Sequence, residues 1–258
     1  MRLRILSLVF VTLAAPLLSG AADAVPLFNG KDLSNFYTFI KGRGKDTDPK
    51  QVFTVKDGVI RISGEEWGCI TSNDAFGDYE LTVEFKWGEK TWAEREKAAR
   101  DSGVLIHSMC EDGGYSGVWM HGIEVQMIEG GTGDLLVVGD ESKAFELTCP
   151  TAEVTEGTPH VYKQGGKPHT INKGRIDWWG RDPGWKDTID FRGKQDVEYP
   201  HGEWNTIHVV AKGSALRVEL NGVLVNEALD VKPANGRIQV QSEGAEVFVR
   251  KIELKPIE

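Results

Sequence analysis

A period of two dominates the distribution of hydrophobic and polar residues along the chain. Between Tyr79 and Trp87, apolar and polar residues alternate without interruption, as they do in a β-strand with one buried face. Similar alternation covers residues 102–107, 121–128, 206–211, 216–220, 237–241 and 247–254. The pattern therefore predicts a chain built mainly of short strands, each with one apolar face.

Turn-forming dipeptides separate these segments. Asp57-Gly58, Asn221-Gly222 and Glu243-Gly244 each stand between two short apolar runs. An Asn-Gly pair between two alternating segments is typical of a tight hairpin, because both residues adopt a positive φ readily. Many short strands with tight turns predict an all-β sandwich of two antiparallel sheets.

Two stretches interrupt the alternation. Residues 90–100 are rich in helix formers and Glu/Lys pairs, which predicts one short solvated helix between strands. Residues 148–202 are polar and rich in Gly, Pro, His and Trp. Long loops within a domain are usually functional, so we expect this stretch to form part of a site wall. Without a linker or repeat, residues 25–258 are interpreted as a single domain.

The first 24 residues have the features of an export signal. Arg2 and Arg4 precede an apolar stretch over residues 5–18, and Ala22-Asp23-Ala24 matches the small-x-small pattern of a cleavage site. An uncleaved membrane anchor is the alternative, but the apolar stretch is short for a span. We therefore expect a periplasmic or secreted protein with no membrane span after cleavage.

Composition narrows the classes of partner and cofactor. The 258 residues are 40% hydrophobic, and their formal net charge of −9 argues against a nucleic-acid partner. Cys69, Cys110 and Cys149 are interpreted as small buried side chains rather than catalytic thiols, and their spacing does not decide whether two of them pair. The sequence contains neither a phosphate loop nor a dinucleotide glycine fingerprint, so no nucleotide cofactor is expected.

The segment at residues 122–130 carries the main candidate site. Alternation places Glu124 and Gln126 on the face opposite to Ile123 and Val125. The apolar pair faces the core, so the polar pair projects from the outer surface, where a curved sheet offers a groove for a sugar. Glu129 would join that face only if a bulge adds one residue. A solvated strand face is the alternative, although the flanks lack the Lys and Arg of a wet strand.

Two other strands supply further candidates. In residues 101–107, Val104 and Ile106 fit the core, which leaves His107 on the groove side as an acid, a base or a metal ligand. Glu84 comes from a third alternating strand and is expected to line the same groove. Each residue also fits a simpler role, as a hydrogen-bonded surface histidine or a solvent-facing glutamate.

Tryptophan and arginine side chains complete the candidate site. Trp178 and Trp179 are adjacent, so they cannot both face one core from a strand. The flat indole of Trp179 or Trp119 can pack against the C–H face of a sugar ring, with core filling as the alternative. Arg181 can hold an anionic oxygen.

Several segments together resemble the 3-keto-disaccharide hydrolase domain family, formerly the domain of unknown function 1080. They are PLFNGKDLSNF (26–36), DGVI (57–60), GDYEL (77–81), DSGV (101–104), GIEVQ (122–126), GEWNT (202–206) and LNG (220–222). The resemblance covers nearly all of the chain after residue 24. The sequence departs from the family pattern at Phe36, where Trp is usual, and in the insertion at residues 90–100.

The resemblance implies a concanavalin A-like jelly roll that acts on a saccharide whose C3 hydroxyl has been oxidised to a ketone. The ketone makes the C2 proton acidic, so a base can remove it and the glycosidic oxygen can leave C1. Hydration then completes a net hydrolysis. This chemistry needs a base, an acid and a group that stabilises the enolate oxygen, such as a divalent metal ion or an arginine.

The resemblance leads to residue roles that can be compared with the structure. We expect Glu124 to be the base or a metal ligand, His107 an acid, a base or a metal ligand, and Arg181 the oxyanion stabiliser. The expected sugar-binding residues are Gln126, Glu84, Trp179 and Trp119. The segment is also similar to the Glu-x-Asp-x-x-Glu strand of laminarinase-type glycosidases, but Gln126 replaces the Asp, which weakens the ordinary glycosidase mechanism. A non-catalytic carbohydrate-binding module is the alternative function.

Overall fold

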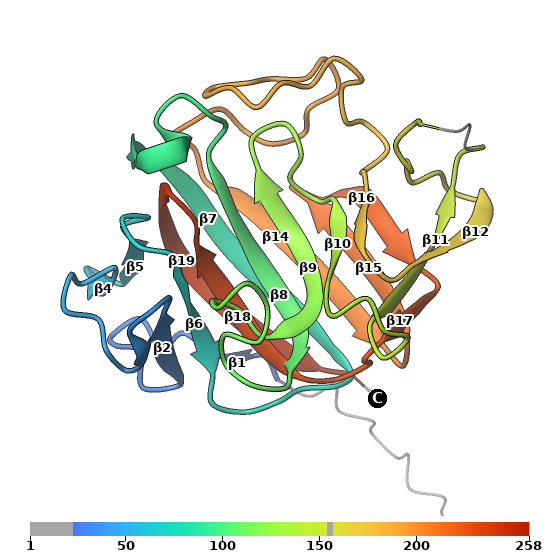
Figure 1. Ribbon diagram of the computed structural model, residues 1–258. Helices are drawn as coiled ribbons and strands as arrows, with labels where there is room; N and C mark the ends of the chain where they lie inside the picture. Colours follow the sequence, from blue (N-terminus) through green and yellow to red (C-terminus); the bar gives the residue numbers. More distant parts are fainter. Residues whose placement is uncertain (1–22, 154–156, 258) are drawn as a thin grey trace, which may run out of the picture.

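The computed structural model describes residues 23–153 and 157–257, which form an antiparallel β-sandwich (Figure 1). The strands are β1 (Val25–Pro26), β2 (Phe36–Ile40), β3 (Gly44–Lys45), β4 (Phe53–Lys56), β5 (Val59–Ile62), β6 (Gly68–Ser72), β7 (Tyr79–Thr91), β8 (Asp101–Met109), β9 (His121–Ile128), β10 (Leu135–Val138), β11 (Glu146–Thr151), β12 (Lys167–Ile171), β13 (Gly174–Ile176), β14 (Asn205–Lys212), β15 (Ala215–Leu220), β16 (Val223–Ala228), β17 (Asp230–Lys232), β18 (Arg237–Ser242) and β19 (Ala245–Pro256). Within these residues, the one helical element is the 3-10 turn η1 (Ala93–Arg95).

Two large sheets form the layers of the sandwich. The front sheet has the strand order β13-β10-β9-β8-β18-β6-β2-β3. The back sheet has the order β16-β15-β14-β7-β19-β5-β4, and β1 pairs with β19. A small third sheet, β12-β11-β17, lies at the side of the sandwich next to β16 (Figure 1). The predicted two-sheet antiparallel sandwich is therefore confirmed.

Alternation along the strands determines which side chains fill the core. Val83 and Phe85 of β7 point inward from the back sheet, and Ile106 and Val125 point inward from the front sheet; all four are fully buried. Burying such side chains stabilises the fold by roughly 1.5–3 kcal/mol each. Because successive side chains alternate, residues such as Glu124 must project from the outer face of the front sheet.

The predicted hairpin at Asn221-Gly222 joins β15 to β16. Asn221 has a φ of 52° and Gly222 a φ of 79°, the left-handed conformations that a two-residue hairpin requires. The Asn221 side chain also accepts a hydrogen bond from the Thr206 amide at 2.9 Å. The hairpin prediction is therefore confirmed.

The helix expected over residues 90–100 is reduced to the single turn η1. β7 continues through Thr91, and Trp92 is extended and provides no side-chain cap for a helix. Arg100 turns inward, where its guanidinium pairs with Glu129 at 2.6 Å. Buried ion pairing thus competes with the local helix propensity and limits the helical segment.

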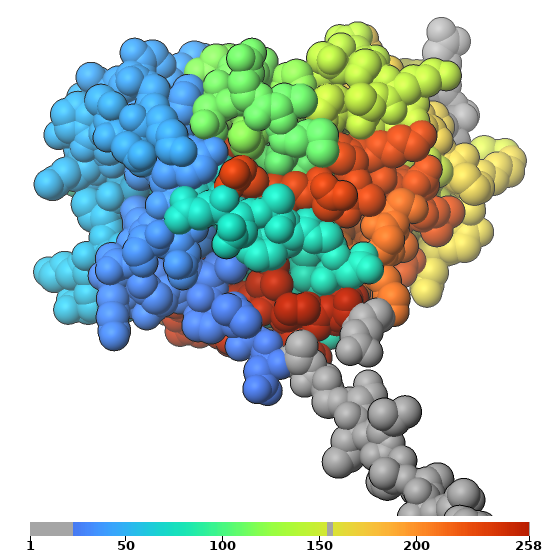
Figure 2. All heavy atoms as spheres, turned by 90° about the horizontal axis from the view of Figure 1, so that it is seen from below, coloured from blue at the N-terminus to red at the C-terminus, as the bar shows by residue number. Residues whose placement is uncertain are grey.

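The long polar stretch at residues 148–202 contains β12 and β13 but is otherwise mostly irregular. Its last part forms loops above the sandwich in the view of Figure 1, and β11 and β12 lie at one side. At the opposite end, seen from below in Figure 2, the turn with Phe76 pairs with the segment at Gly236 through two backbone hydrogen bonds of 2.8 and 2.9 Å. These turns cover the lower ends of the two sheets.

Other expectations from the sequence concern the chain terminus and the cysteines. Residues 1–22 of the expected export segment lie outside the described residues, so the segment stays a prediction. Across the described chain, no helix has the length and apolarity to cross a membrane. Cys69 and Cys149 are buried as expected, whereas Cys110 is exposed, and all three are free thiols.

Candidate functional site

A polar cavity of about 250 Å³ opens on the outer face of the front sheet. Glu124 and Gln126 of β9, Asp101 of β8 and Glu243 of the β18–β19 turn contribute its polar wall. The volume lies just below the ~300–1,000 Å³ of typical ligand pockets, so it suits a single small ring. Four acidic or amide side chains from three segments therefore converge on one cavity.

The strand register explains this convergence. In the β8–β9 ladder, Leu105 pairs with Glu124 and Gly103 pairs with Gln126, so all four lie on the same face of the sheet. Glu124 is only 5% exposed, although it lies on the outer face. Asp101 lies two residues before Gly103, so its side chain is on the same face, and it accepts a 2.5 Å hydrogen bond from the Gln126 amide. The register thus joins the two strands into one polar site.

Three carboxyl groups in this cavity have raised pKa values. Burial is the main cause of the raised pKa of Glu124, and the neighbouring Asp101 charge raises it further. Burial likewise raises the pKa of Asp101, against the opposing effect of Arg95. Glu243 has a pKa well above the ordinary carboxyl value, because of burial and then Asp101 and Glu124. The cavity therefore holds exchangeable protons near neutral pH, and these protons belong to a coupled set.

Two arginines partly balance the acidic groups. Arg95 pairs with Asp101 and, at 3.0 Å, with Asp187. Arg175 of β13 lines the cavity, and its guanidinium also pairs with Asp134 at 3.2 Å. The Arg175 side chain is 37% exposed, so it retains donors that can reach a ligand oxygen.

Aromatic side chains form another wall of the cavity. Trp119 is 5% exposed, and its ring stacks on Trp67 at 5.5 Å and on Tyr115 at 6.4 Å between centroids. Trp119 and Tyr115 both line the cavity. This wall gives the site an apolar surface opposite its charged groups.

Buried polar groups at the site lack partners among the described residues. The Oε1 and Nε2 atoms of Gln241, which is fully buried, and the Nε1 atom of Trp119 form no hydrogen bond with a described residue. Each such group costs about 1–3 kcal/mol of stability, so its retention requires an explanation. Gln241 lies beside Glu124 and Trp119 lines the cavity, so unpaired polar atoms border the site from two segments, as is typical of a ligand-binding site.

His107 does not lie where the sequence predicted. β-bulges in the pairing of β8 with β9 and β18 give His107 a φ of 53° and remove it from the regular alternation. Its ring is fully buried, packs edge-on to Tyr79 at 5.8 Å, and donates from Nδ1 to the Pro233 carbonyl at 2.9 Å. Burial lowers its pKa to about 4, so it remains neutral. The expected groove position of His107 is therefore wrong.

Glu84 also lies away from the cavity. It belongs to β7 of the back sheet, where the alternation directs it to the outer face of that sheet. Its carboxylate accepts a 2.5 Å hydrogen bond from Arg250. Alternation identified the outward face correctly but could not tell which sheet contains the strand, so the expected position in the groove is wrong.

Arg181 and Trp179 occupy two other sites. Arg181 is largely buried, pairs with Asp134 and stacks on Trp185 at 4.3 Å. Trp179 is 39% exposed and lines a separate hollow at the side of the sandwich. Neither residue lines the cavity with Glu124, so Arg175 rather than Arg181 supplies a guanidinium there.

The expected metal ligands do not share a site. His107 packs against Tyr79 between the two sheets and is hydrogen-bonded to the Pro233 carbonyl, whereas Glu124 lines the cavity on the outer face of the front sheet. Within residues 23–153 and 157–257, no group of three or more His, Cys, Asp and Glu side chains is arranged to hold a metal ion. The donor set proposed from the sequence therefore does not fit a divalent metal, and no step is assigned to one.

Several cavity residues were missed from the sequence, and some of them carried a signal. Asp101 lies two positions before Gly103, so period two places it on the outer face with Glu124. Gln241 does not line the cavity but follows the buried Val240, so period two directs it to the same face, beside Gly103. Glu243 and Arg95 lie outside the regular strands, and no local pattern indicates where their side chains point. Only the tertiary arrangement brings these two residues to the cavity.

Comparison with known proteins gives one family and a shared fold. The profile of the 3-keto-alpha-glucoside-1,2-lyase-like domain matches residues 23–255. A crystal structure of a candidate glycosyl hydrolase from Parabacteroides distasonis is 19% identical with a TM-score of 0.53, over 91% of this chain and 94% of that chain. A second crystal structure of a candidate glycosyl hydrolase from the same organism is 17% identical with a TM-score of 0.51, over 91% of this chain and 100% of that chain. No curated protein matches the sequence.

Proposed function

Because the chain belongs to the 3-keto-alpha-glucoside-1,2-lyase-like domain family, we propose that it cleaves glycosides whose sugar carries a ketone at C3. The reaction takes place in the cavity that contains Glu124. The observation that carries this proposal is the burial of the Glu124 carboxyl in a sugar-sized space beside two further carboxyls and a partly free guanidinium.

The chemistry is an elimination followed by hydration. A base removes the C2 proton, and the electron pair of the C–H bond forms an enolate with the C3 carbonyl. The enolate then forms a C1=C2 double bond as the C1–O bond breaks, and the leaving oxygen takes a proton. Water adds to C1 of the resulting enone while C2 is reprotonated, so the sum is hydrolysis.

Glu124 is the proposed base. A carboxylate whose pKa is raised by burial is a stronger base than an exposed one, and its pKa lies closer to the operating pH. Glu243, whose pKa is raised well above the ordinary carboxyl value, keeps its proton and donates it to the leaving oxygen. Neighbouring groups with separate proton states can thus divide the roles of base and acid.

Arg175 and the remaining cavity residues position the substrate. Arg175 donates to the C3 oxygen as negative charge develops on it, a contribution comparable to the roughly 3–4 kcal/mol of one oxyanion-hole donor. Gln126, held by Asp101, orients a ring hydroxyl. Trp119, whose ring stacks with those of Trp67 and Tyr115, contributes apolar surface to the wall against which the sugar packs.

The experiment is cleavage of a 4-nitrophenyl 3-keto-glucoside by the purified protein. We expect release of nitrophenol by the wild type and a loss of about 10²–10⁴-fold in kcat for Glu124→Gln. Glu80→Gln is the matched control, because Glu80 pairs with Lys255 on the outer face of the back sheet and should leave the rate unchanged. Binding without any turnover would instead favour a carbohydrate-binding module.

A further inference from the structure

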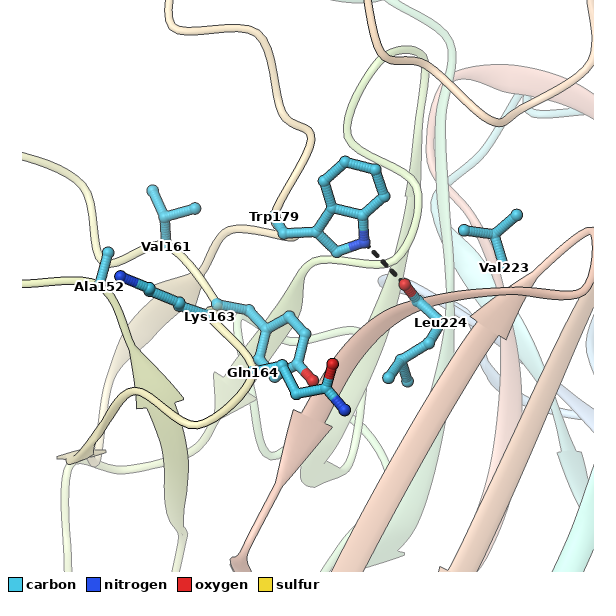
Figure 3. Close-up of a pocket in the computed structure, with 8 residues that line it drawn as sticks. Ala152, Val161, Lys163, Gln164, Trp179, Val223 and Leu224 are labelled. Carbon is cyan, nitrogen blue, oxygen red and sulfur yellow. Dashed lines mark hydrogen bonds between the residues drawn. The ribbon is translucent and has the colours of Figure 1, made fainter.

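A second hollow, of about 670 Å³, lies at the side of the sandwich (Figure 3). It shares no lining residue with the cavity that contains Glu124. Val161 and Gln164 line it from the segment between β11 and β12, Val223 and Leu224 from β16, and Trp179 from the loop after β13. The volume falls within the ~300–1,000 Å³ of small-molecule sites.

Trp179 presents a fixed ring at this hollow. Trp178 is buried in the core, so the next side chain along the chain points outward, and 39% of Trp179 is exposed. The Trp179 indole N–H donates to the Leu224 carbonyl at 2.7 Å, as the dashed line in Figure 3 marks. Since this bond occupies the only polar atom of the indole, what remains exposed is apolar ring surface whose orientation is already set.

The opposite wall is also preformed. The Tyr162 amide donates to the Asp177 carbonyl at 2.8 Å, and the Tyr162 hydroxyl donates to Glu227 at 2.6 Å. Figure 3 shows the Gln164 amide in the space below Trp179, on the side of Leu224. Gln164 is exposed, so its carbonyl and NH₂ groups are open to a ligand.

We propose that this hollow is a second saccharide-binding site, independent of the reaction at Glu124. One face of a sugar ring packs on the fixed indole of Trp179, and hydroxyls on its edge bond to the Gln164 amide. A ligand with an apolar face and a polar edge matches both walls, whereas a wholly apolar ligand would bring no partner to Gln164. Because the Trp179 ring is already held by its bond to Leu224, packing on it costs little side-chain entropy.

Methyl NMR separates the two sites within one sample. Val161, Val223 and Leu224 report on the hollow, while Leu136 and Val138 report on the Glu124 cavity. The probes are trehalose, maltose and cellobiose, none of which carries a C3 ketone. We expect at least one of them to shift the hollow methyl signals with a millimolar dissociation constant, in the wild type and equally in Glu124→Gln.

Variants then identify the contacts. Trp179→Ala should weaken binding at least tenfold, and Gln164→Ala, at an exposed position, should weaken it several-fold. Tyr199→Ala removes an exposed aromatic side chain outside the hollow, 51% exposed, and should bind as the wild type does. The proposal is overturned if no disaccharide shifts the hollow methyls, if Trp179→Ala binds unchanged, or if hexanol shifts them and no sugar does.

Discussion

The carboxylate of Glu124 lies over Gly103 of the neighbouring strand, in the space that the Cβ of any other residue would occupy. A Cβ built on Gly103 would collide with Glu124 Oε1 and would lie 2.5 Å from Gln241 Oε1. Gly103 needs no positive φ, so its backbone conformation does not require glycine. What requires glycine there is the space that the two functional side chains occupy.

This relationship predicts a specific effect of Gly103→Ala. The added methyl meets only the ends of two flexible side chains, so the fold should persist while Glu124 and Gln241 are displaced. A displacement of about 1 Å at a reacting group can cost ~10²-fold in rate, and we expect a loss of that order in kcat. Gly77→Ala is the control, because its new Cβ would meet Asn235 at an ordinary 3.8 Å. Equal activity of both variants would contradict the role of this contact.

Gln241 is expected to position Glu124 rather than to stabilise the fold. Its amide lies beside Glu124, where it favours the ionised carboxyl and lowers the pKa, yet its oxygen and nitrogen complete no hydrogen bond with a described residue. Gln241→Leu should therefore raise the pKa of Glu124, move the pH–rate profile to higher pH and reduce kcat more at pH 6 than at pH 9. The unfolding midpoint should be unchanged or higher, since an unpaired buried amide is removed. A loss of stability without a shift in the profile would show a structural role.

The pH dependence of the wild type follows from the raised pKa of Glu124. The base must be ionised, and its pKa is raised above the ordinary 4.5, so kcat/KM should be low at pH 5 and increase with pH above the usual carboxyl range. Deprotonation of Glu243 at higher pH should then lower the rate and give a bell-shaped profile. A profile that levels off near pH 4.5 would be inconsistent with a buried base.

Glu198 predicts a pH dependence of stability outside the site. It is 3% exposed, accepts hydrogen bonds from Trp87 at 2.5 Å and Thr132 at 2.7 Å, and burial raises its pKa from 4.5 to about 8. The folded state thus holds a proton that the unfolded state releases above pH ~4.5. Its stabilising contribution is complete below that pH and is lost as the pH rises through about 8.

The measurement is the free energy of unfolding of the wild type and of Glu198→Gln from pH 4.5 to 9. We expect the wild type to lose about 1–3 kcal/mol more than the variant over this range. Glutamine can keep a hydrogen bond to each partner. Its carbonyl oxygen accepts from Trp87, and its NH₂ group donates to the Thr132 hydroxyl, which then donates to the Ile128 carbonyl, 3.2 Å away. Glu203→Gln, at an exposed carboxyl, should follow the wild type. Parallel curves for Glu198→Gln and the wild type would refute the assignment.

Period-two alternation was sufficient to predict the sandwich, the hairpin at Asn221 and the outward direction of Glu124. It failed at His107, because β-bulges interrupt the alternation, and a bulge in β8 has no signature in the local hydrophobic pattern. It failed at Glu84, because outward residues look alike in both sheets and only strand order distinguishes them.

The choice between arginines shows the same limit. Arg181 and Arg175 lie six positions apart in a stretch with little regular structure, and both contact Asp134. The pairing of β13 with β10 directs Arg175 to the outer face beside Leu136, whereas the Arg181 guanidinium stacks on Trp185. Sequence spacing contains no information on that difference, since it depends on how β13 joins the sheet.

The central claim is that Glu124 removes the C2 proton of a 3-keto-glycoside, and deuterium incorporation tests it most directly. Cleavage is carried out in D₂O, and the released sugar is analysed by NMR and mass spectrometry, with a sample lacking protein to measure spontaneous exchange. We predict deuterium at C2 in every product molecule formed by the wild type, and product formation by Glu124→Gln that is slower by about 10²–10⁴-fold. Rapid cleavage in which the product keeps its original C2 proton would contradict elimination and the assigned role of Glu124.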